Sequence, residues 1–480
     1  MPESQSPQCK NLPNIKVKNF GPIANGEVTL RPLTVFMGPS NTGKSWLATL
    51  LYSLQQRQKK FAQSYFYGLF EIATNEVDKV VKFPENPSYW LKKIDSDSVI
   101  KLSTSEKNVI KKFLEYESDL IKDEMLRCFG LSSYEYLIRE NTKKSIIEFN
   151  SIDNYIFGNY SSILKINSTT TNYFVNPPNC INLSEAKKNY EYNIFRKRIL
   201  SSSEDNHIDT LQLFGELILN RNHLRHPKNQ SAWYLPADRG GIMHAHQAVV
   251  SALIQNASRA GIRKQSSIPV LSGILSDFLE NLISLAQDHR AYSPRHKGGG
   301  HAETLEKNIL GGLVNIDQTD TNYPRFSWKP YKWKRSLPLL SASSMVSELA
   351  PLALYLRHLV TEGDLLILEE PEAHLHPSKQ VELINEVATW VQAGIQVVLT
   401  THSEWVLEQL SNIVGASKSK KNISLNTNQV GLWQFQSQNG SGSEIREVKW
   451  DDEGGYTSGF ESVADDLHNY WVKLVEGGDD

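Results

Sequence analysis

The stretch Gly38-Pro39-Ser40-Asn41-Thr42-Gly43-Lys44-Ser45 decides the fold of this 480-residue chain. It fits the pattern G-x-x-x-x-G-K-[S/T], follows the apolar run 33–37, and precedes a helix expected over Trp46 to Gln58. In this pattern the glycines let backbone N–H groups turn toward phosphate oxygens, and the helix N-terminus adds its dipole. A chance glycine-rich turn is a poor alternative, because the motif is complete and in context. We therefore predict a phosphate-binding loop, in which Lys44 reaches the β- and γ-phosphates of a nucleotide and the Ser45 hydroxyl binds Mg²⁺.

A second signal lies far along the chain, in Asp364-Leu365-Leu366-Ile367-Leu368-Glu369-Glu370-Pro371. This apolar run is typical of a buried strand, and it delivers two adjacent carboxylates to the end of that strand. Glu369 can hold the Mg²⁺ shell, and Glu370 can polarise the water that attacks a phosphate. The alternative is a strand that ends in solvated acids, which is common for one Glu but less so for a pair beside a phosphate-binding loop.

The segment after these carboxylates predicts the fold class. Pro377 to Ala393 reads as a helix with proline in its first turn, and the apolar run 395–399 follows it. Strand, helix and strand with continuous apolar strands indicate a right-handed βαβ unit in a parallel sheet. We therefore expect an α/β fold of the P-loop class with its site at the strand ends. The second strand ends in Thr400-Thr401-His402-Ser403, so His402 is placed to sense the γ-phosphate.

The two signals must meet at one phosphate, so most of the intervening chain interrupts a single core. We expect residues 1–60 and 231–480 to form the two parts of that core, and residues 61–230 to be an insertion. Lys/Glu-rich stretches at 105–121 and 134–149 predict that the insertion is mainly helical. By elimination, the insertion and the tail at 456–474 would recognise a partner or trigger.

Composition limits the location of the protein and the kinds of partner. With 51 Lys+Arg against 53 Asp+Glu, the net charge of −2 excludes a globally basic surface, so DNA contacts would need local patches. Runs of basic residues are usually solvated faces of a protein. This chain has such runs at 57–60, 221–228, 259–264, 332–335 and 418–421. The three cysteines are far apart without CxxC spacing, and no apolar run is long enough to span a membrane. We expect a cytoplasmic protein with no membrane partner, and with DNA as a secondary candidate after protein.

The three segments together resemble the Walker A, Walker B and switch-histidine motifs of ABC-type ATPases, within the SMC-like and OLD-like (overcoming lysogenisation defect) group. Residues 15–23 resemble the family's first strand and its NFGPI turn, and residues 369–377 resemble its EEPEAHLHP run. The resemblance implies that ATP and Mg²⁺ are the cofactors. It also implies that Glu370 is the catalytic glutamate, Glu369 a Mg²⁺-side carboxylate and His402 the switch residue. His374 and His376 form only a weak metal pair, and a D-loop at the dimer interface is the favoured interpretation.

The resemblance extends to a signature segment at 343–354, in which Ser344 and Met345 replace the usual glycines. It implies that Ser343 reaches the γ-phosphate of ATP on a second subunit, so the ATPase heads would form a homodimer or higher homo-oligomer. Met345 places a bulky side chain where close backbone approach is expected. An N-capped amphipathic helix over 347–360 is the plainer interpretation, and both can hold. A Q-loop glutamine is assigned to Gln247 as a guess.

Three functions stay open. The favoured one is a stand-alone OLD-like ATPase of a bacterial antiphage system, an oligomeric sensor and scaffold. OLD-type relatives often carry a Toprim nuclease domain, and the residues after Ser403 are too few for one, so a nuclease or toxin effector would be supplied in trans. The second is an SMC/RecF-like ATPase of DNA repair or chromosome maintenance that binds DNA directly. The third is a structural ATP-binding scaffold with little turnover, which the altered signature motivates.

Overall fold

The computed structural model describes most of the predicted core and part of the insertion. The described residues are 13–60, 99–101, 104, 107–108, 121–150, 161–167, 171–176, 180–182, 231–245, 271–287, 299–317, 325–419, 423–438, 442–451, 455–456 and 469–472. None of the helices within these ranges is long and apolar enough to cross a membrane.

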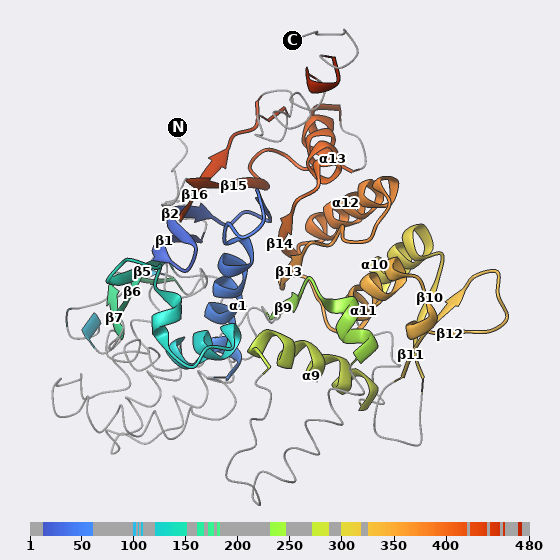
Figure 1. Cartoon of the computed structure of the whole chain (residues 1–480), viewed down its shortest axis with the longest axis horizontal. Coiled ribbons are helices and arrows are strands. Elements are labelled where there is room, and N and C mark those ends of the chain that lie inside the picture. The colour runs from blue at the N-terminus through green and yellow to red at the C-terminus, as the bar shows by residue number, and fades with distance from the viewer. Residues whose placement is uncertain are drawn as a thin grey trace, which may run out of the picture.

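An eleven-stranded sheet organises the described chain (Figure 1). Its order is β7 (Thr171–Asn176), β6 (Ser161–Asn167), β5 (Lys144–Asn150), β1 (Asn14–Phe20), β2 (Ile23–Thr29), β16 (Gly442–Val448), β15 (Val430–Gln438), β3 (Leu33–Met37), β14 (Gln396–Thr401), β13 (Leu365–Glu369) and β9 (Ala232–Leu235). The strands from β15 to β9 are parallel, whereas β1, β2, β5, β6 and β7 pair antiparallel. The predicted α/β class is confirmed.

The predicted βαβ unit is present. Helix α12 (Pro377–Gln392) joins β13 to β14, and these strands pair in parallel. Pro377 occupies the first helical turn, and Gly394 follows the helix with a φ of +89°, a conformation that glycine adopts without strain. The sequence signals at both ends of this helix therefore act as expected.

Helices cover both faces of the parallel strands, which explains the continuous apolar runs. Alternate residues of β3 point to opposite faces: Phe36 packs in the core with α1 (Lys44–Lys60), while Val35 and Met37 pack in the core with the other helices. The second core includes α9 (Gly273–Gln287), α10 (Gly299–Leu305), the π-helical turn Glu306–Leu310, α11 (Ser344–His358), α12 and α13 (Glu404–Gly415). Short 3₁₀ turns at Tyr134–Leu137, Leu339–Ser341 and Ala416–Ser419 complete the helical elements.

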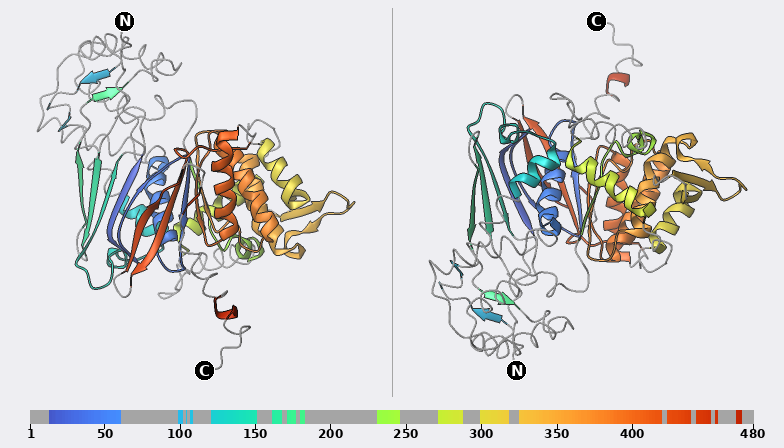
Figure 2. Two further views of the ribbon diagram at one scale, coloured as in Figure 1. Left: turned by 90° about the horizontal axis from the view of Figure 1, so that it is seen from above. Right: turned by 90° about the horizontal axis from the view of Figure 1, so that it is seen from below.

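The expectation of a mainly helical insertion is wrong for the described residues of 61–230. The stretch 134–149 begins with a 3₁₀ turn and continues as strand β5, which pairs with β1 at Lys18 and Ile146. Ile147 and Phe149 are buried while Glu148 is exposed, so a period-two pattern outweighs the Lys/Glu composition. The insertion therefore extends the core sheet through β5, β6 and β7 at the end opposite the β10–β11 hairpin (Figure 2).

Two small sheets stand apart from the main one. Strand β10 (Gly312–Asp317) pairs antiparallel with β11 (Arg325–Pro330), which also pairs with β12 (Leu337–Pro338). Strands β4 (Val99–Lys101) and β8 (Cys180–Asn182) form a two-stranded antiparallel sheet. Most of the stretch 105–121, which was also expected to be helical, lies outside the described residues, as do the runs 221–228 and 259–264.

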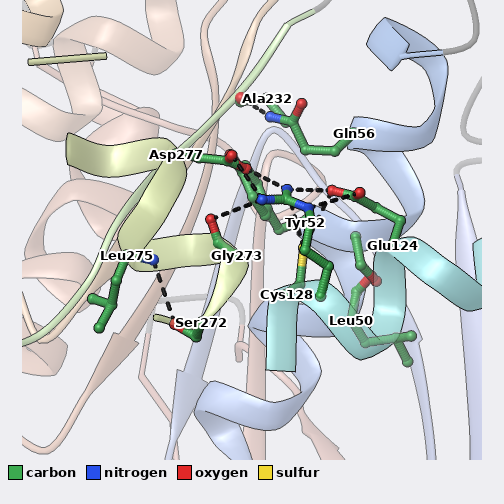
Figure 3. A network of polar contacts seen from close by, with 12 residues as sticks. Leu50, Tyr52, Gln56, Glu124, Cys128, Ala232, Ser272, Gly273, Leu275 and Asp277 are labelled. Atoms are coloured by element: carbon green, nitrogen blue, oxygen red, sulfur yellow. Dashed lines mark hydrogen bonds and ion pairs between the residues drawn. The ribbon is translucent and has the colours of Figure 1, made fainter. Parts of the chain in front are cut away.

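A network of charged side chains ties helix α1 to the insertion and to α9 (Figure 3). The guanidinium of Arg127, on the helix at 121–129, donates to both carboxylate oxygens of Glu124 and to both of Asp277 on α9. Tyr52 of α1 donates its hydroxyl to Asp277 at 3.0 Å, and burial raises the pKa of that hydroxyl. Because α1 begins in the phosphate-binding loop, the network connects that loop to the insertion.

We expect Arg127→Met to destabilise the fold. The change removes the cation that neutralises Glu124, whose side chain is 5% exposed, and Asp277, which is 16% exposed. Breaking an ion pair of this burial costs roughly 2–3 kcal/mol, because the remaining carboxylates stay partly desolvated. Urea unfolding of the purified variant measures the loss.

The matched control is Arg446→Met, since Arg446 pairs with Glu444 on the surface and is 61% exposed. A surface pair of this kind contributes less than about 1 kcal/mol. Equal unfolding free energies for the two variants would show that the network does not hold α1 in place.

Candidate functional site

The predicted phosphate-binding loop, residues 38–45, runs from the end of β3 into the start of α1. Asn41 has a φ of +62° and Gly43 one of +99°, so the loop turns back toward its own strand before α1 begins. Asparagine tolerates this left-handed conformation better than most residues, and glycine adopts it freely. Thr42 donates its hydroxyl to the carbonyl of Pro39 at 2.8 Å and closes the turn. The residues at 39–41 are exposed, while Gly43 and Lys44 are buried.

The hairpin formed by β15 and β16 packs against this loop. The sequence did not indicate this contact. A Cβ at Gly38 would lie 2.3 Å from the carbonyl oxygen of Phe435 on β15, so only glycine fits there. Ser443 of β16 donates its hydroxyl to the carbonyl of Thr42 at 2.5 Å. The loop backbone is therefore fixed from the side of β15 and β16.

Lys44 folds back over the loop that precedes it. Its Nζ donates to the carbonyls of Gly38 at 2.9 Å and Pro39 at 2.7 Å. Burial lowers the pKa of Lys44 to about 8, although the negative charges of Glu370 and Glu372 act in the opposite direction. The parallel pairing of β3 with β14 and of β14 with β13 brings Lys44 and Glu370 to the same edge of the sheet, where the charge of Glu370 acts on Lys44.

Ser45 and Glu369 are also brought together. The Ser45 hydroxyl hydrogen-bonds to the Glu369 carboxylate, which also accepts from the backbone N–H of Ala237 at 3.3 Å. Burial raises the pKa of Glu369, and these hydrogen bonds oppose the increase. The hydroxyl and the carboxylate, far apart in sequence, thus form one cluster of oxygen atoms at the start of α1.

Glu370 is held beside His402. The Glu370 Oε1 lies 3.4 Å from the His402 Nε2, and this hydrogen bond lowers the pKa of Glu370, with Lys44 and Arg239 adding to the effect. Glu369 and Glu370 are therefore shifted in opposite directions, a pattern that separates the roles of paired carboxylates. Glu370 has a φ of +41°, and its backbone N–H donates to the Thr400 carbonyl at 3.1 Å.

A third carboxylate, Glu372, supports the strand end that carries His402. It is 8% exposed and accepts hydrogen bonds from the Thr401 hydroxyl at 2.5 Å and from the His402 backbone N–H at 3.0 Å. Burial raises the pKa of Glu372, and these two hydrogen bonds oppose that shift. Glu372 lies within the EEPEAHLHP run, where no local pattern indicates this supporting role.

Arg239 is the largest omission of the sequence reasoning. Its side chain is 2% exposed, and its Nη1 donates to the carbonyl of Glu369 at 2.7 Å. Its Nη2 donates to the carbonyl of Glu370 at 3.3 Å, and its Nε donates to the carbonyl of Glu348 on α11 at 2.9 Å. Arg239 therefore joins the backbone of both candidate carboxylates to the signature-like helix. The available signal was an arginine four residues after a buried strand, at the end of Pro236-Ala237-Asp238-Arg239.

The remaining predicted residues have simpler surroundings. Ser343 is exposed and caps α11 by accepting from the backbone N–H of Val346, and its proposed action on a second subunit stays a prediction. His376 caps α12, while the exposed His374 lies 3.9 Å from Glu348. Among the described residues, no group of three or more His, Cys, Asp and Glu side chains is arranged to hold a metal. Gln247 lies outside the described residues.

The donor atoms at this edge fit a magnesium-bound nucleotide. Mg²⁺ prefers hard oxygen ligands and is usually bound by one or two protein oxygens together with phosphates and water. Ser45 and Glu369 supply a hydroxyl and a carboxylate in contact with each other. Lys44, which donates to two carbonyls of the loop, provides a cation where phosphate oxygens would lie. Ser45 and Glu369 would hold the metal, and residues 38–45 would hold the phosphates.

We expect Arg239→Lys to lower the turnover of ATP by about tenfold while changing nucleotide affinity little. Lysine keeps the charge, but it cannot reproduce the forked contacts to the carbonyls of Glu369 and Glu370. Each lost hydrogen bond in a buried site costs about 1–3 kcal/mol. Steady-state ATP hydrolysis, with separate kcat and KM, measures the effect.

Arg357→Lys is the control, because Arg357 also contacts a carbonyl, that of Val314 at 2.8 Å, and a buried carboxylate, Glu306, outside the phosphate-binding edge. Equal kcat losses in both variants would contradict a positioning role for Arg239.

Comparisons with known proteins give similarity at two levels. The chain is similar to a solved structure of an SMC head bound to the C-winged helix domain of ScpA, with 10% identity and a TM-score of 0.43 over 91% of this chain and 97% of that chain. It is also similar to the SMC head domain from Thermotoga maritima, with 10% identity and a TM-score of 0.38 over 91% of this chain and 98% of that chain. A third similar structure is the Smc head domain with an extended coiled coil bound to the C-terminal domain of ScpA derived from Pyrococcus furiosus. Its sequence identity is 10% and its TM-score 0.42, over 96% of this chain and 100% of that chain. The comparison with curated proteins gave no match. Residues 241–407, which include α11, β13 and His402, match the sequence model described as AAA ATPase domain, and over this segment the chain is similar to that family.

Proposed function

We propose that this chain is a Mg²⁺-dependent ATPase whose heads form a homo-oligomer and control a separate effector, a nuclease or toxin, in bacterial antiphage defence. The observation that carries the ATPase proposal is the convergence of Lys44, Ser45, Glu369, Glu370 and His402 at the ends of three parallel strands. The match of residues 241–407 to the AAA ATPase domain supports it from a different direction.

The chemistry follows from the placement of these side chains. Lys44 stabilises the charge of the terminal phosphates, and bound Mg²⁺ would neutralise further phosphate charge. Glu370 is ionised at neutral pH, as an ordinary glutamate is, and the lowered pKa keeps it ionised beside the other carboxylates, so it can accept the proton of the attacking water. His402 holds that carboxylate from one side, and the Glu372 contact fixes the backbone of His402.

Assembly and control are supported by the exposed end of α11 and by the contacts between α1 and the insertion. Ser343 is exposed at the N-terminus of α11 and caps that helix, and in the proposed oligomer its hydroxyl and the first N–H groups of the helix would contact a phosphate of a second subunit. The contacts among Tyr52, Asp277 and Arg127 give a physical link between the helix of the phosphate-binding loop and the insertion. Movement of α1 on nucleotide binding would reach the insertion, where we place recognition of the trigger or effector.

We expect Glu370→Gln to reduce ATP turnover by about 100-fold or more while leaving ATP binding intact, because loss of a general base costs 10²–10⁴-fold. Lys44→Ala should instead weaken ATP binding by roughly tenfold or more, because it removes a charge-assisted hydrogen bond to phosphate. Phosphate release and fluorescent-nucleotide titration measure the two effects. Glu382→Gln, at a surface ion pair on α12, is the control.

Unchanged turnover in Glu370→Gln, together with lost binding in Lys44→Ala, would contradict an enzyme and favour a structural ATP-binding scaffold. The same variants test the defence role when they are expressed with the neighbouring genes and challenged with phage. Both variants should lose protection, and protection by Lys44→Ala equal to that of the unaltered chain would exclude ATP-driven control of an effector.

A further inference from the structure

The turn between β11 and β12 combines exposed cations with exposed aromatic side chains. We call residues 329–336, Lys329-Pro330-Tyr331-Lys332-Trp333-Lys334-Arg335-Ser336, the tip. It carries four cations and two aromatic side chains, and the longer stretch 325–342 contains no Asp or Glu. Strands β10 and β11, which carry the tip, project from the helices that pack around α11 (Figure 1).

The backbone of the tip is a defined turn. Its first residue pairs with β10 at Leu313, and the backbone N–H of Tyr331 donates to the carbonyl of Gly311 at 3.1 Å. The N–H of Trp333 donates to the carbonyl of Pro330 at 2.9 Å and closes the turn. Leu339, beyond β12, is buried and fixes the far end of the hairpin to the core. The side chains of residues 331–336 therefore project from a turn whose backbone is held by hydrogen bonds and by the buried Leu339.

Both aromatic side chains of the turn face solvent. Tyr331 is 51% exposed and Trp333 is 54% exposed, whereas Phe326, nearer the core on β11, is 5% exposed. Large aromatic rings are usually buried in folded proteins, so two exposed rings in one short turn indicate a binding surface. The four cations are exposed as well, and within the described part of the chain none of them forms an ion pair.

We propose that the tip binds single-stranded nucleic acid. Lys332, Lys334 and Arg335 would contact phosphates, while the rings of Tyr331 and Trp333 would stack on bases. Interleaved cations and aromatic rings are the combination that binds single strands, because each base offers a face for stacking and each linkage offers a negative charge. A duplex hides those faces within its own base stack, so it matches the cations but not the rings.

Charge complementarity is what separates the tip from the other basic runs. The chain as a whole is nearly neutral, with a net charge of −2, so attraction of nucleic acid depends on a local excess of cations. The stretch 325–342 has such an excess, with five cations and no acid, and the nearby carboxylates of Glu306 and Glu303 act on Tyr331 at its base. This proposal goes beyond ATP hydrolysis, because binding at the tip uses none of the phosphate-binding residues.

Fluorescence anisotropy with a labelled single-stranded DNA of about 16 nucleotides, without nucleotide and at several salt concentrations, tests the proposal. We expect Lys332→Glu/Lys334→Glu to weaken binding by about tenfold or more and to make the salt slope shallower by roughly 1.4, since two phosphate contacts are lost. We expect Trp333→Ala to weaken binding by about tenfold through lost stacking. The single strand should also bind more tightly than the duplex of the same sequence.

Matched controls separate the tip from general effects of charge and aromatic content. Lys143→Glu/Lys144→Glu changes the same charge at exposed lysines near β5, and Trp405→Ala removes a tryptophan that is 55% exposed on α13. Both controls should bind the oligonucleotide with no more than about a twofold loss, by the weak effect of distant exposed charges. All of the changed side chains are exposed, and thermal unfolding checks that each variant is folded.

The proposal is overturned if the unaltered chain does not bind the single strand at about 50 mM salt. It is also overturned if the tip variants bind as the controls do, or if duplex binds as tightly as single strand. Loss of a protein partner from the tip variants, with oligonucleotide binding unchanged, would assign the tip to protein docking instead.

Discussion

The pairing of β14 with β3 is the constraint on which the rest of the structure depends. Five residues of each strand are in parallel register, from Val397 opposite Leu33 to Thr401 opposite Met37. Since β13 pairs with the other edge of β14, the ends of all three strands lie at one edge of the sheet. The phosphate-binding loop, the two carboxylates and His402 each follow one of these ends. A one-residue shift in this register would turn the buried side chains to the wrong face and displace the site.

The part of this arrangement that sequence could predict is the part with a strong local signature. Strands buried on both faces read as near-continuous apolar runs, and 33–37 and 365–368 are of this kind. Pro377 and Gly394 marked the two ends of α12, since proline suits a first helical turn and glycine suits a positive φ. The meeting of Lys44 with Glu370 followed from the chemistry, because both motifs act on the same phosphate.

What could not be predicted depends on partners that are distant in sequence. The Lys/Glu-rich composition of 134–149 predicts a helix there, yet pairing of β5 with β1 buries Ile147 and Phe149. Arg239 gave no periodic signal, and its role emerges only when the backbone carbonyls of Glu369 and Glu370 converge on it. Buried polar side chains that hold a backbone are selected by three-dimensional geometry, and no local pattern records them.

The central claim is that segments from both ends of the chain build one magnesium–nucleotide site at the edge formed by β3, β14 and β13. A structure of the Glu370→Gln variant with ATP and Mg²⁺ tests this claim most directly. We predict phosphates within residues 38–45, a metal ion bound by Ser45 with Glu369 beside it, and the side chain at position 370 facing the γ-phosphate. Nucleotide bound elsewhere on the chain, or phosphates in the loop with positions 369 and 370 turned away from them, would contradict it.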